Sequence, residues 1–224
     1  MKNLRKYFSD QLSGLGLELG PLHRPMVKHR GMTVRYVDRM KVEELRKHYP
    51  ELSEFGFVGP DIIDDAQTLS SIRYGDFYDF LIAAHIIEHL PNPIEALRSW
   101  CRVVKPGGRV YLVVPDKMIT FDRNREVTPL EHMILDYESP DPFRDFIHFL
   151  DYSANVNGKT GAETITHAYD LKNKDYSIHY HVFLPSGMLE LLEWVRDNVG
   201  GFSILEGPLQ EEGSDEFHFM LEVR

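Results

Sequence analysis

The chain has 224 residues, 42% of them hydrophobic, which suits one α/β domain with a sizeable core. A formal net charge of −10 without any Lys/Arg block argues against duplex nucleic acid and anionic membranes as partners. The single cysteine, Cys101, excludes an internal disulfide framework and fits the cytoplasm, and its place on an apolar helix favours packing over nucleophilic chemistry. No apolar run approaches the roughly 20 residues that span a bilayer, and the start lacks a signal-peptide core.

In the first half of the chain, the residue pattern predicts a short helix followed by strands and helices. Leu4, Tyr7, Phe8 and Leu12 have helical spacing, which predicts an amphipathic helix within residues 1–13. Apolar runs and punctuating residues predict the elements that follow. We expect strands at 14–19, 32–37, within 57–63, 78–84 and 109–114, helices at 42–48 and 94–104, and a brief helix or turn at 66–72.

The stretch from Tyr78 to Pro115 decides the fold class. An apolar run ends in His85, Glu88 and His89, and a helix-like segment, a Pro-Gly-Gly turn and a second apolar run follow. Two buried strands joined by a helix are most simply parallel neighbours in a sheet. Ligands bind beyond the carboxyl ends of such strands. The polar cluster is therefore expected at a ligand site.

The second half predicts an irregular segment and then a regular end. Residues 116–184 are rich in His, Asp, Tyr and Phe and show no clean period, so we expect an irregular insertion. A capped amphipathic helix at 186–199 stops at Gly200-Gly201. Strands at 202–205 and 217–223 form an expected antiparallel terminal hairpin. We therefore predict one domain with four parts. Residues 1–13 form an N-terminal helix, 14–115 the core, 116–184 the insertion, and 185–224 the C-terminal helix and hairpin.

Three polar patterns in the core carry chemistry, each beside a plainer interpretation. Glu18-x-Gly20 with Asp38 twenty residues after Glu18 suits a nucleoside ligand, but also a tight turn and a surface acid. Asp65 is placed either to accept from an adenine amino group or to cap a short helix. His85-x-x-Glu88-His89 matches a zinc-peptidase pattern, which requires a helix. The strand-to-helix junction and the prolines that follow it argue against a peptidase.

Residues 14–115 resemble a class I S-adenosylmethionine-dependent methyltransferase. The motifs that carry the resemblance are Leu17-Glu18-Leu19-Gly20, Val37-Asp38, Asp65-Ala66, Tyr78-Asp79-Phe80-Leu81-Ile82, His85-x-x-Glu88-His89 and Lys105-Pro106-Gly107-Gly108. The continuation Pro115-Asp116-Lys117, Thr120-Phe121-Asp122-x-x-Arg125, Thr128 and His132 resembles a bacterial subgroup associated with cell-surface polysaccharide synthesis.

The resemblance implies a doubly wound, Rossmann-like, mostly parallel seven-stranded sheet with an antiparallel terminal hairpin. It implies S-adenosylmethionine as cofactor, with Glu18 and Gly20 at the methionine and ribose moieties and Asp38 on the ribose hydroxyls. Asp65 and Ala66 would meet the adenine, and His85 would face the sulfonium. The chain departs from the family pattern where Leu22 and Arg24 replace glycines, and the first helix of the fold is truncated.

The insertion is expected to hold the acceptor, which we interpret as a small polar molecule or a glycan hydroxyl. A base near neutral pKa suits hydroxyl methylation, which makes His132, His179 and His181 the candidates, although each alone suits a structural or surface role too. His89, Asp122 and Arg125 are the expected acceptor contacts. Arg123 and Arg125 suit an anionic group, or alternatively salt bridges with Asp122 or Glu126.

Two rival functions remain beside methyl transfer. The altered glycine turn suits a catalytically degenerate fold that acts as a binding or scaffold protein. The histidine-rich insertion suits a metal-dependent hydrolase, in which His179 and His181 bind metal with Asp170 or Asp175. We assign no metal ligand from the sequence, and the oligomeric state stays open.

Overall fold

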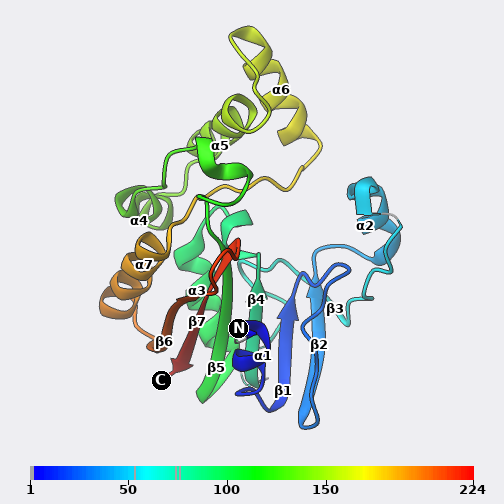
Figure 1. Cartoon of the computed structure of the whole chain (residues 1–224), viewed down its shortest axis with the longest axis vertical. Helices are drawn as coiled ribbons and strands as arrows, with labels where there is room; N and C mark the ends of the chain where they lie inside the picture. The colour runs from blue at the N-terminus through cyan, green and yellow to red at the C-terminus, as the bar shows by residue number, and fades with distance from the viewer. Residues whose placement is uncertain (1–2, 53, 74, 76) are drawn as a thin grey trace.

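The computed structural model has a single mixed sheet with the strand order β3-β2-β1-β4-β5-β7-β6 (Figure 1). It describes residues 3–52, 54–73, 75 and 77–224. The strands are β1 (Gly14–Leu19), β2 (Met32–Asp38), β3 (Ile62–Ile63), β4 (Tyr78–Ala84), β5 (Val104–Pro115), β6 (Phe202–Gln210) and β7 (Glu216–Val223). The first five strands are parallel to one another, and β7 is antiparallel to both β5 and β6. The predicted fold class and terminal hairpin are confirmed.

The helices flank this sheet and extend from one end of it (Figure 1). They are α1 (Leu4–Ser9), α2 (Val42–His48), α3 (Pro93–Val103), α4 (Leu130–Glu138), α5 (Pro142–Asn155), α6 (Ala162–Asn173) and α7 (Pro185–Asn198). Local chemistry explains the start of α3, because the Asn92 side chain accepts from the Glu95 backbone N–H at 2.9 Å and Pro93 fits the first turn.

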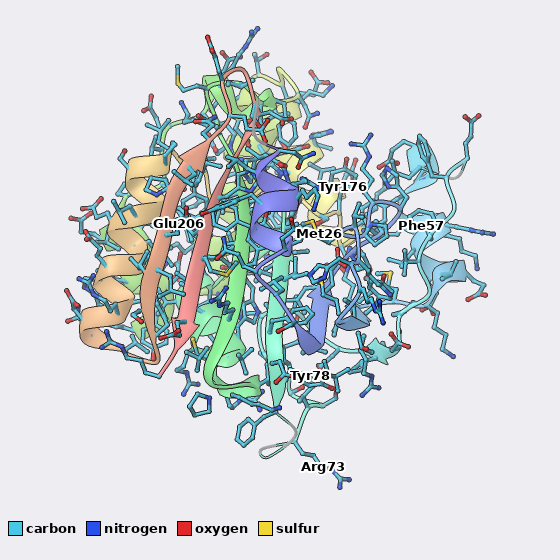
Figure 2. All side chains as sticks on the ribbon, turned by 60° about the horizontal axis from the view of Figure 1, so that its bottom comes forward. Met26, Phe57, Arg73, Tyr78, Tyr176 and Glu206 are labelled. Atoms are coloured by element: carbon cyan, nitrogen blue, oxygen red, sulfur yellow. The ribbon has the colours of Figure 1, made fainter. Side chains whose placement is uncertain are left out.

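The two faces of the sheet are covered unequally. Leu81 and Leu112 on one face pack with Trp100 of α3 and Val195 of α7 in the larger core. On the other face Tyr111 packs with a smaller group that includes α1 (Figure 2). A six-residue helix is too short to be stable alone, so burial of its side chains must hold α1 in place. Residues 1–2 of the predicted N-terminal segment lie outside the described residues.

The insertion is helical, which corrects the prediction of an irregular segment. It contains α4, α5 and α6, and α5 and α6 pack around their own apolar cluster, which includes Phe149 and Ala168. The sequence pattern hid these helices because polar side chains such as His148 of α5 and Asp136 of α4 are buried. A buried polar residue interrupts the apolar period on which a helix prediction depends. Figure 1 shows α5 and α6 projecting beyond the end of the sheet.

Some boundaries follow the prediction and others differ from it. The short third strand within 57–63 is present with two residues, and residues 66–72 form turns, both as predicted. Strand β6 continues to Gln210 because it pairs with β7 beyond the predicted end. Residues 20–31, between β1 and β2, contain no helix, so the predicted truncation is confirmed. Cys101 packs against the larger core as expected, and burial raises the pKa of its thiol to about 12. In the part of the chain described here, no helix is long and apolar enough to cross a membrane.

Candidate functional site

A cavity of about 350 Å³ opens at the carboxyl ends of β1, β2 and β4. This volume is within the range of roughly 300–1,000 Å³ that is usual for ligand sites. One wall comes from the core and the other from residues 174–184, which run from α6 to α7 and are called the strap below. The core residues on the wall are Gly20, Leu22, Val37, Asp38, Arg39, Tyr49, Asp65, Ala66, Gln67, His85, Ile86, His89, Leu90 and Pro91, and the strap adds Asp175, Tyr176, Ser177 and Tyr180.

Five of the six predicted cofactor residues lie on this wall, and Asp38 is the best-defined anion among them. Its side chain is buried at the end of β2, where Oδ1 accepts from the Arg39 N–H at 2.7 Å. Burial raises the pKa of Asp38 to about 6. Asp65 also lines the cavity, and its Oδ1 accepts from the N–H groups of Gln67 and Thr68 at 2.9 and 3.0 Å. Asp65 therefore caps a turn and faces the cavity at once.

The turn after β1 requires glycine at one position and strains another residue. Gly20 has φ +52°, and a Cβ there would lie 2.6 Å from Cδ1 of Ile86. Leu22 has φ +45°, a left-handed conformation that is unusual for a leucine. The backbone thus follows a glycine-type course although the sequence lacks the second glycine. The chain keeps the shape of the turn at the cost of local strain.

Glu18, the sixth predicted cofactor residue, does not line the cavity. Its carboxylate is buried, and Oε1 accepts from the Met26 N–H at 2.6 Å, while Oε2 has no hydrogen-bond partner among the described residues. Burial raises the pKa of Glu18 to about 7. Glu18 therefore holds the segment between β1 and β2 through its hydrogen bond with Met26. Its contact with the methionine moiety of a cofactor stays a prediction.

His85 lies at the end of β4 in a left-handed conformation with φ +54°. Its Nε2 is 2.8 Å from Oε2 of Glu216. The Glu216 carboxylate also accepts two hydrogen bonds from Arg5, one at each oxygen and both at 2.6 Å. Burial opposes charge on His85, but the hydrogen bond to Glu216 and the Glu88 carboxylate raise its pKa. The sequence pattern gave no sign of Glu216, because only the pairing of β5 with β7 brings it here.

The neighbouring histidine, His89, lines the cavity and adjoins the strap. Its Nδ1 is 2.9 Å from the Ile178 carbonyl, and its ring lies 4.6 Å from that of His179. Glu88 is fully buried, and neither of its carboxylate oxygens has a hydrogen-bond partner among the described residues. Burial raises the pKa of Glu88. Because His85 and His89 are on a strand end and a 3-10 turn rather than one helix, the zinc-peptidase pattern is not formed.

His179 and Asp122 form a buried pair beside this wall. His179 Nδ1 is 2.5 Å from Asp122 Oδ2, and among the described residues Nε2 has no hydrogen-bond partner. Burial opposes ionisation of Asp122, but hydrogen bonds from His179 and Arg125 lower its pKa. The carboxylate orients the imidazole, as a carboxylate does for the histidine base of many enzymes.

Arg125 does not offer a free cation to an acceptor, which corrects its predicted role. Its side chain is 1% exposed, and it donates to Asp151 at 2.6 Å, to Asp122 at 2.9 Å and to the His179 carbonyl at 2.8 Å. The salt bridge with Asp122 is the alternative interpretation given above, and Asp151 is an additional partner. Arg125 therefore holds the strap against the start of the insertion.

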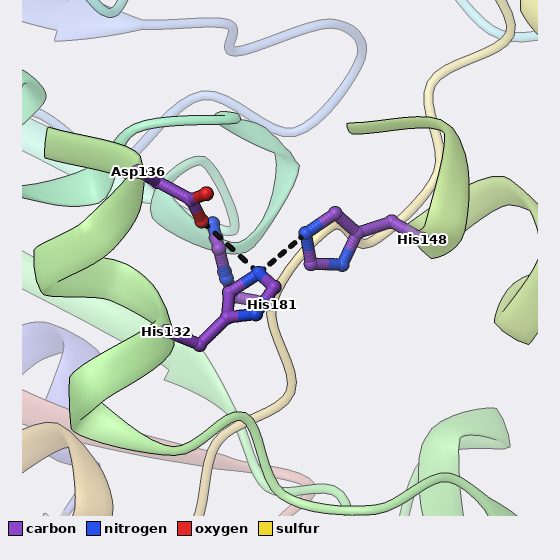
Figure 3. A group of neighbouring side chains, drawn as sticks. All are labelled: His132, Asp136, His148 and His181. Carbon is purple, nitrogen blue, oxygen red and sulfur yellow. Dashed lines mark hydrogen bonds and ion pairs between the residues drawn. The ribbon is translucent and has the colours of Figure 1, made fainter. Parts of the chain in front are cut away.

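None of the three predicted bases lines the cavity itself, but the ring of His179 lies 4.6 Å from that of His89 on the cavity wall. His132 and His181 instead have their Nε2 atoms against His148 and the Pro91 carbonyl. They meet Asp136 and His148 in a separate group (Figure 3). The i,i+4 spacing of His132 and Asp136 was the one signal in the sequence for this group. Burial lowers the pKa of His148 to about 3 and of His181 to about 4, so both rings are neutral at pH 7.

The rim of the cavity is closed by an ion pair between the core and the strap. Arg39 Nη1 is 2.6 Å from Asp175 Oδ2, and Arg39 Nη2 also lies 2.6 Å from His48 Nε2. Asp175 is therefore engaged by Arg39, and Asp170 is exposed on α6, so neither joins His179 and His181 as the predicted metal ligand.

Comparisons with known proteins identify the family of the chain. Residues 15–155 match the family model described as "Methyltransferase domain". A ubiquinone biosynthesis O-methyltransferase of Vibrio parahaemolyticus is 30% identical over 107 residues, which cover 46% of this chain and 43% of that protein. The chain thus aligns with less than half the length of that relative.

Two solved structures show the same fold. A Rhodobacter sphaeroides protein provisionally described as a Zn-dependent alcohol dehydrogenase has a TM-score of 0.58 at 12% identity, with 100% of this chain and 90% of that chain covered. The plantazolicin methyltransferase BamL, solved with S-adenosylhomocysteine, has a TM-score of 0.50 at 10% identity, with 93% and 76% covered. At these identities the likeness shows the fold alone. The family model covers more than half of the chain, which therefore belongs to the methyltransferase-domain family.

Proposed function

We propose that the protein transfers the methyl group of S-adenosylmethionine to a hydroxyl of a small polar or glycan acceptor. The observation that carries the proposal is the two-sided cavity, in which the core supplies Asp38 and Asp65 and the strap supplies Tyr176 and Tyr180. Aromatic and polar side chains on the strap suit the stacking and hydrogen bonding by which sugars are bound. The O-methyltransferase relative supports oxygen as the methylated atom.

The residues present fit the cofactor. Gly20 leaves open a turn that a Cβ would fill, and the ionised Asp38 carboxylate suits two ribose hydroxyls. Trp100 Nε1 donates to the Ala66 carbonyl at 2.7 Å, which holds Ala66 and its neighbour Asp65 on the cavity wall, where they would contact the adenine. When bound, S-adenosylmethionine supplies the electrophilic methyl group. The protein must align the acceptor and remove its hydroxyl proton.

We assign proton removal to His179, the predicted base whose ring lies 4.6 Å from that of the cavity-lining His89. Asp122 accepts from Nδ1–H of His179, which leaves Nε2 as the proton acceptor. The ring of His89 lies beside that of His179 and lines the cavity, where it would contact the acceptor. General-base catalysis of this kind contributes typically about 10²- to 10⁴-fold in rate. The strap thus carries both the acceptor contacts and the base.

The test is formation of S-adenosylhomocysteine in the presence of a panel of nucleotide sugars, oligosaccharides and polyhydroxylated aromatics. With an active acceptor, His179→Gln should lower kcat by about 10²-fold or more and leave S-adenosylmethionine binding within about threefold. His167→Gln is the matched control, since His167 on α6 bonds only Ser153 among the described residues. Methylation of aromatics alone would disprove the glycan part, and an unchanged kcat in His179→Gln would disprove the base.

A further inference from the structure

The group formed by His132, Asp136, His148 and His181 lies outside the cavity and is not explained by methyl transfer. One ligand atom from each residue lies within 4.8 Å of the others. The residues come from three separate segments, namely α4, α5 and the strap (Figure 3). We propose that these four side chains bind one divalent transition-metal ion, for which Zn²⁺ is the best match.

The group has too few hydrogens on its ring nitrogens for the contacts between its side chains, which favours a bound cation. His132 Nε2 is 3.0 Å from His148 Nε2 and 3.1 Å from Asp136 Oδ2. A ring nitrogen of a histidine carries one hydrogen or one lone pair, so His132 Nε2 has a single hydrogen to serve both contacts. If that hydrogen points at Asp136, the two histidine nitrogens face each other without a proper hydrogen bond. A metal ion at the centre uses the lone pairs of all these atoms at once.

His181 supplies a second, independent observation. Its side chain is fully buried, and its Nε2 is 3.0 Å from the Pro91 carbonyl, which fixes the hydrogen on Nε2. Nδ1 is then an unprotonated nitrogen, and it has no hydrogen-bond partner among the described residues. A buried lone pair without a partner costs free energy, which metal coordination recovers. Histidine ligands commonly donate their other N–H to a backbone carbonyl in this way.

The dimensions agree with a tetrahedral site. Zn–N distances of about 2.0–2.1 Å place neighbouring ligand atoms about 3.3 Å apart, close to the 3.0 and 3.1 Å contacts seen here. Arg144 Nε donates to the other oxygen of Asp136 at 2.5 Å, so the carboxylate is oriented from outside the group. Imidazole and carboxylate ligands suit zinc among the first-row metals.

The site is closed by four protein ligands, which is typical of a structural rather than a catalytic metal. It joins α4, α5 and the strap at a point next to the cavity, since Tyr180 and Pro91 line the cavity wall. The metal therefore fixes the strap against the core. This inference is independent of the acceptor and of the base, so it stands or falls separately from the proposed function.

The first experiment measures metal in the full chain, purified without a polyhistidine tag, by inductively coupled plasma mass spectrometry. We expect about one zinc per chain, or uptake of about one equivalent after incubation with Zn²⁺. Co²⁺ in place of Zn²⁺ should give the visible absorption bands of a tetrahedral ion. Removal by a chelator should lower the Tm, and Zn²⁺ should restore it. Uptake below about a tenth of an equivalent, with an unchanged Tm, would overturn the proposal.

Variants locate the ion. His148→Gln and Asp136→Asn should each lose most of the bound metal, whereas His167→Gln should keep it. Glu88, His89 and His179 also lie within 4.8 Å of one another by their ligand atoms, so Glu88→Gln tests that group. Loss of metal in Glu88→Gln together with retention in folded His148→Gln would place the ion elsewhere and contradict the proposal. Circular dichroism shows which variants are folded, and the chelation result on the unmodified chain needs no variant.

Discussion

The core and the insertion place their polar side chains by different means. In the core, Asp38 and His85 lie where β2 and β4 end, so strand direction alone sets them at the cavity. In the insertion, Asp122, Arg125 and His179 are positioned by one another, through contacts between segments more than 50 residues apart. A site on strand ends tolerates loss of one side chain, whereas a buried network depends on each member.

The largest expected effect tests that dependence at Arg125. Replacement by Met would leave the carboxylates of Asp122 and Asp151 without their cation, and loss of one member of a buried ion pair typically costs about 3–5 kcal/mol. We expect the free energy of unfolding in urea to fall by about that amount. The exposed neighbour Arg123, replaced in the same way, should change it by less than about 0.5 kcal/mol. A similar small change in Arg125→Met would show that the network is not needed for stability.

The next effect concerns the core and should alter binding rather than stability. Asp38→Asn removes the anionic acceptor at the end of β2, and hydrogen bonds to a charged group contribute about 1.5–3 kcal/mol. S-adenosylmethionine affinity, measured by calorimetry, should weaken by about 10- to 100-fold. Asp10→Asn, a change at an exposed carboxylate just after α1, should leave the affinity unaltered. Equal affinity in the wild type and Asp38→Asn would remove Asp38 from the cofactor site.

The pH dependence of S-adenosylmethionine binding is a second test of the role assigned to Asp38. Burial raises the pKa of Asp38 to about 6, and only the ionised carboxylate accepts from both ribose hydroxyls. Affinity should therefore be full above pH 7 and be lost as the pH falls through 6. At pH 5 about one molecule in eleven is ionised, which gives about tenfold weaker binding. The Asp38→Asn variant should show no such dependence between pH 5 and 7, and a dependence that persists there would belong to another group.

The smallest effect lies where the two regions meet. Arg39 and Asp175 join the core to the strap at the cavity rim, but their side chains are 32% and 76% exposed. Such a pair contributes about 0.2–1 kcal/mol, so Arg39→Ala should speed cofactor dissociation by no more than about fivefold. Stopped-flow measurements would detect it, with Lys6→Ala as a control for a remote surface pair. A change of a hundredfold would mean that the strap depends on this contact alone.

The sequence by itself determined the sheet and the edge of the sheet at which the cavity opens. Apolar runs predicted the five parallel strands. The residues at or after the strand ends were predicted to contact a ligand, and five of them line the cavity, namely Gly20, Asp38, Asp65, Ala66 and His85. This was possible because a buried strand has a readable pattern and its end has a known direction. Both the apolar pattern and the strand end are set by residues that are close together in the sequence.

Only the tertiary structure decided which polar groups are neighbours. Glu216 reaches His85 through the pairing of β7 with β5, and His148 and His181 meet through the packing of α5 and the strap on α4. The helices of the insertion were hidden for the same reason, since their buried residues are polar and satisfy one another. Contacts between distant segments leave no period in a single sequence, so their chemistry emerges only once the chain is folded.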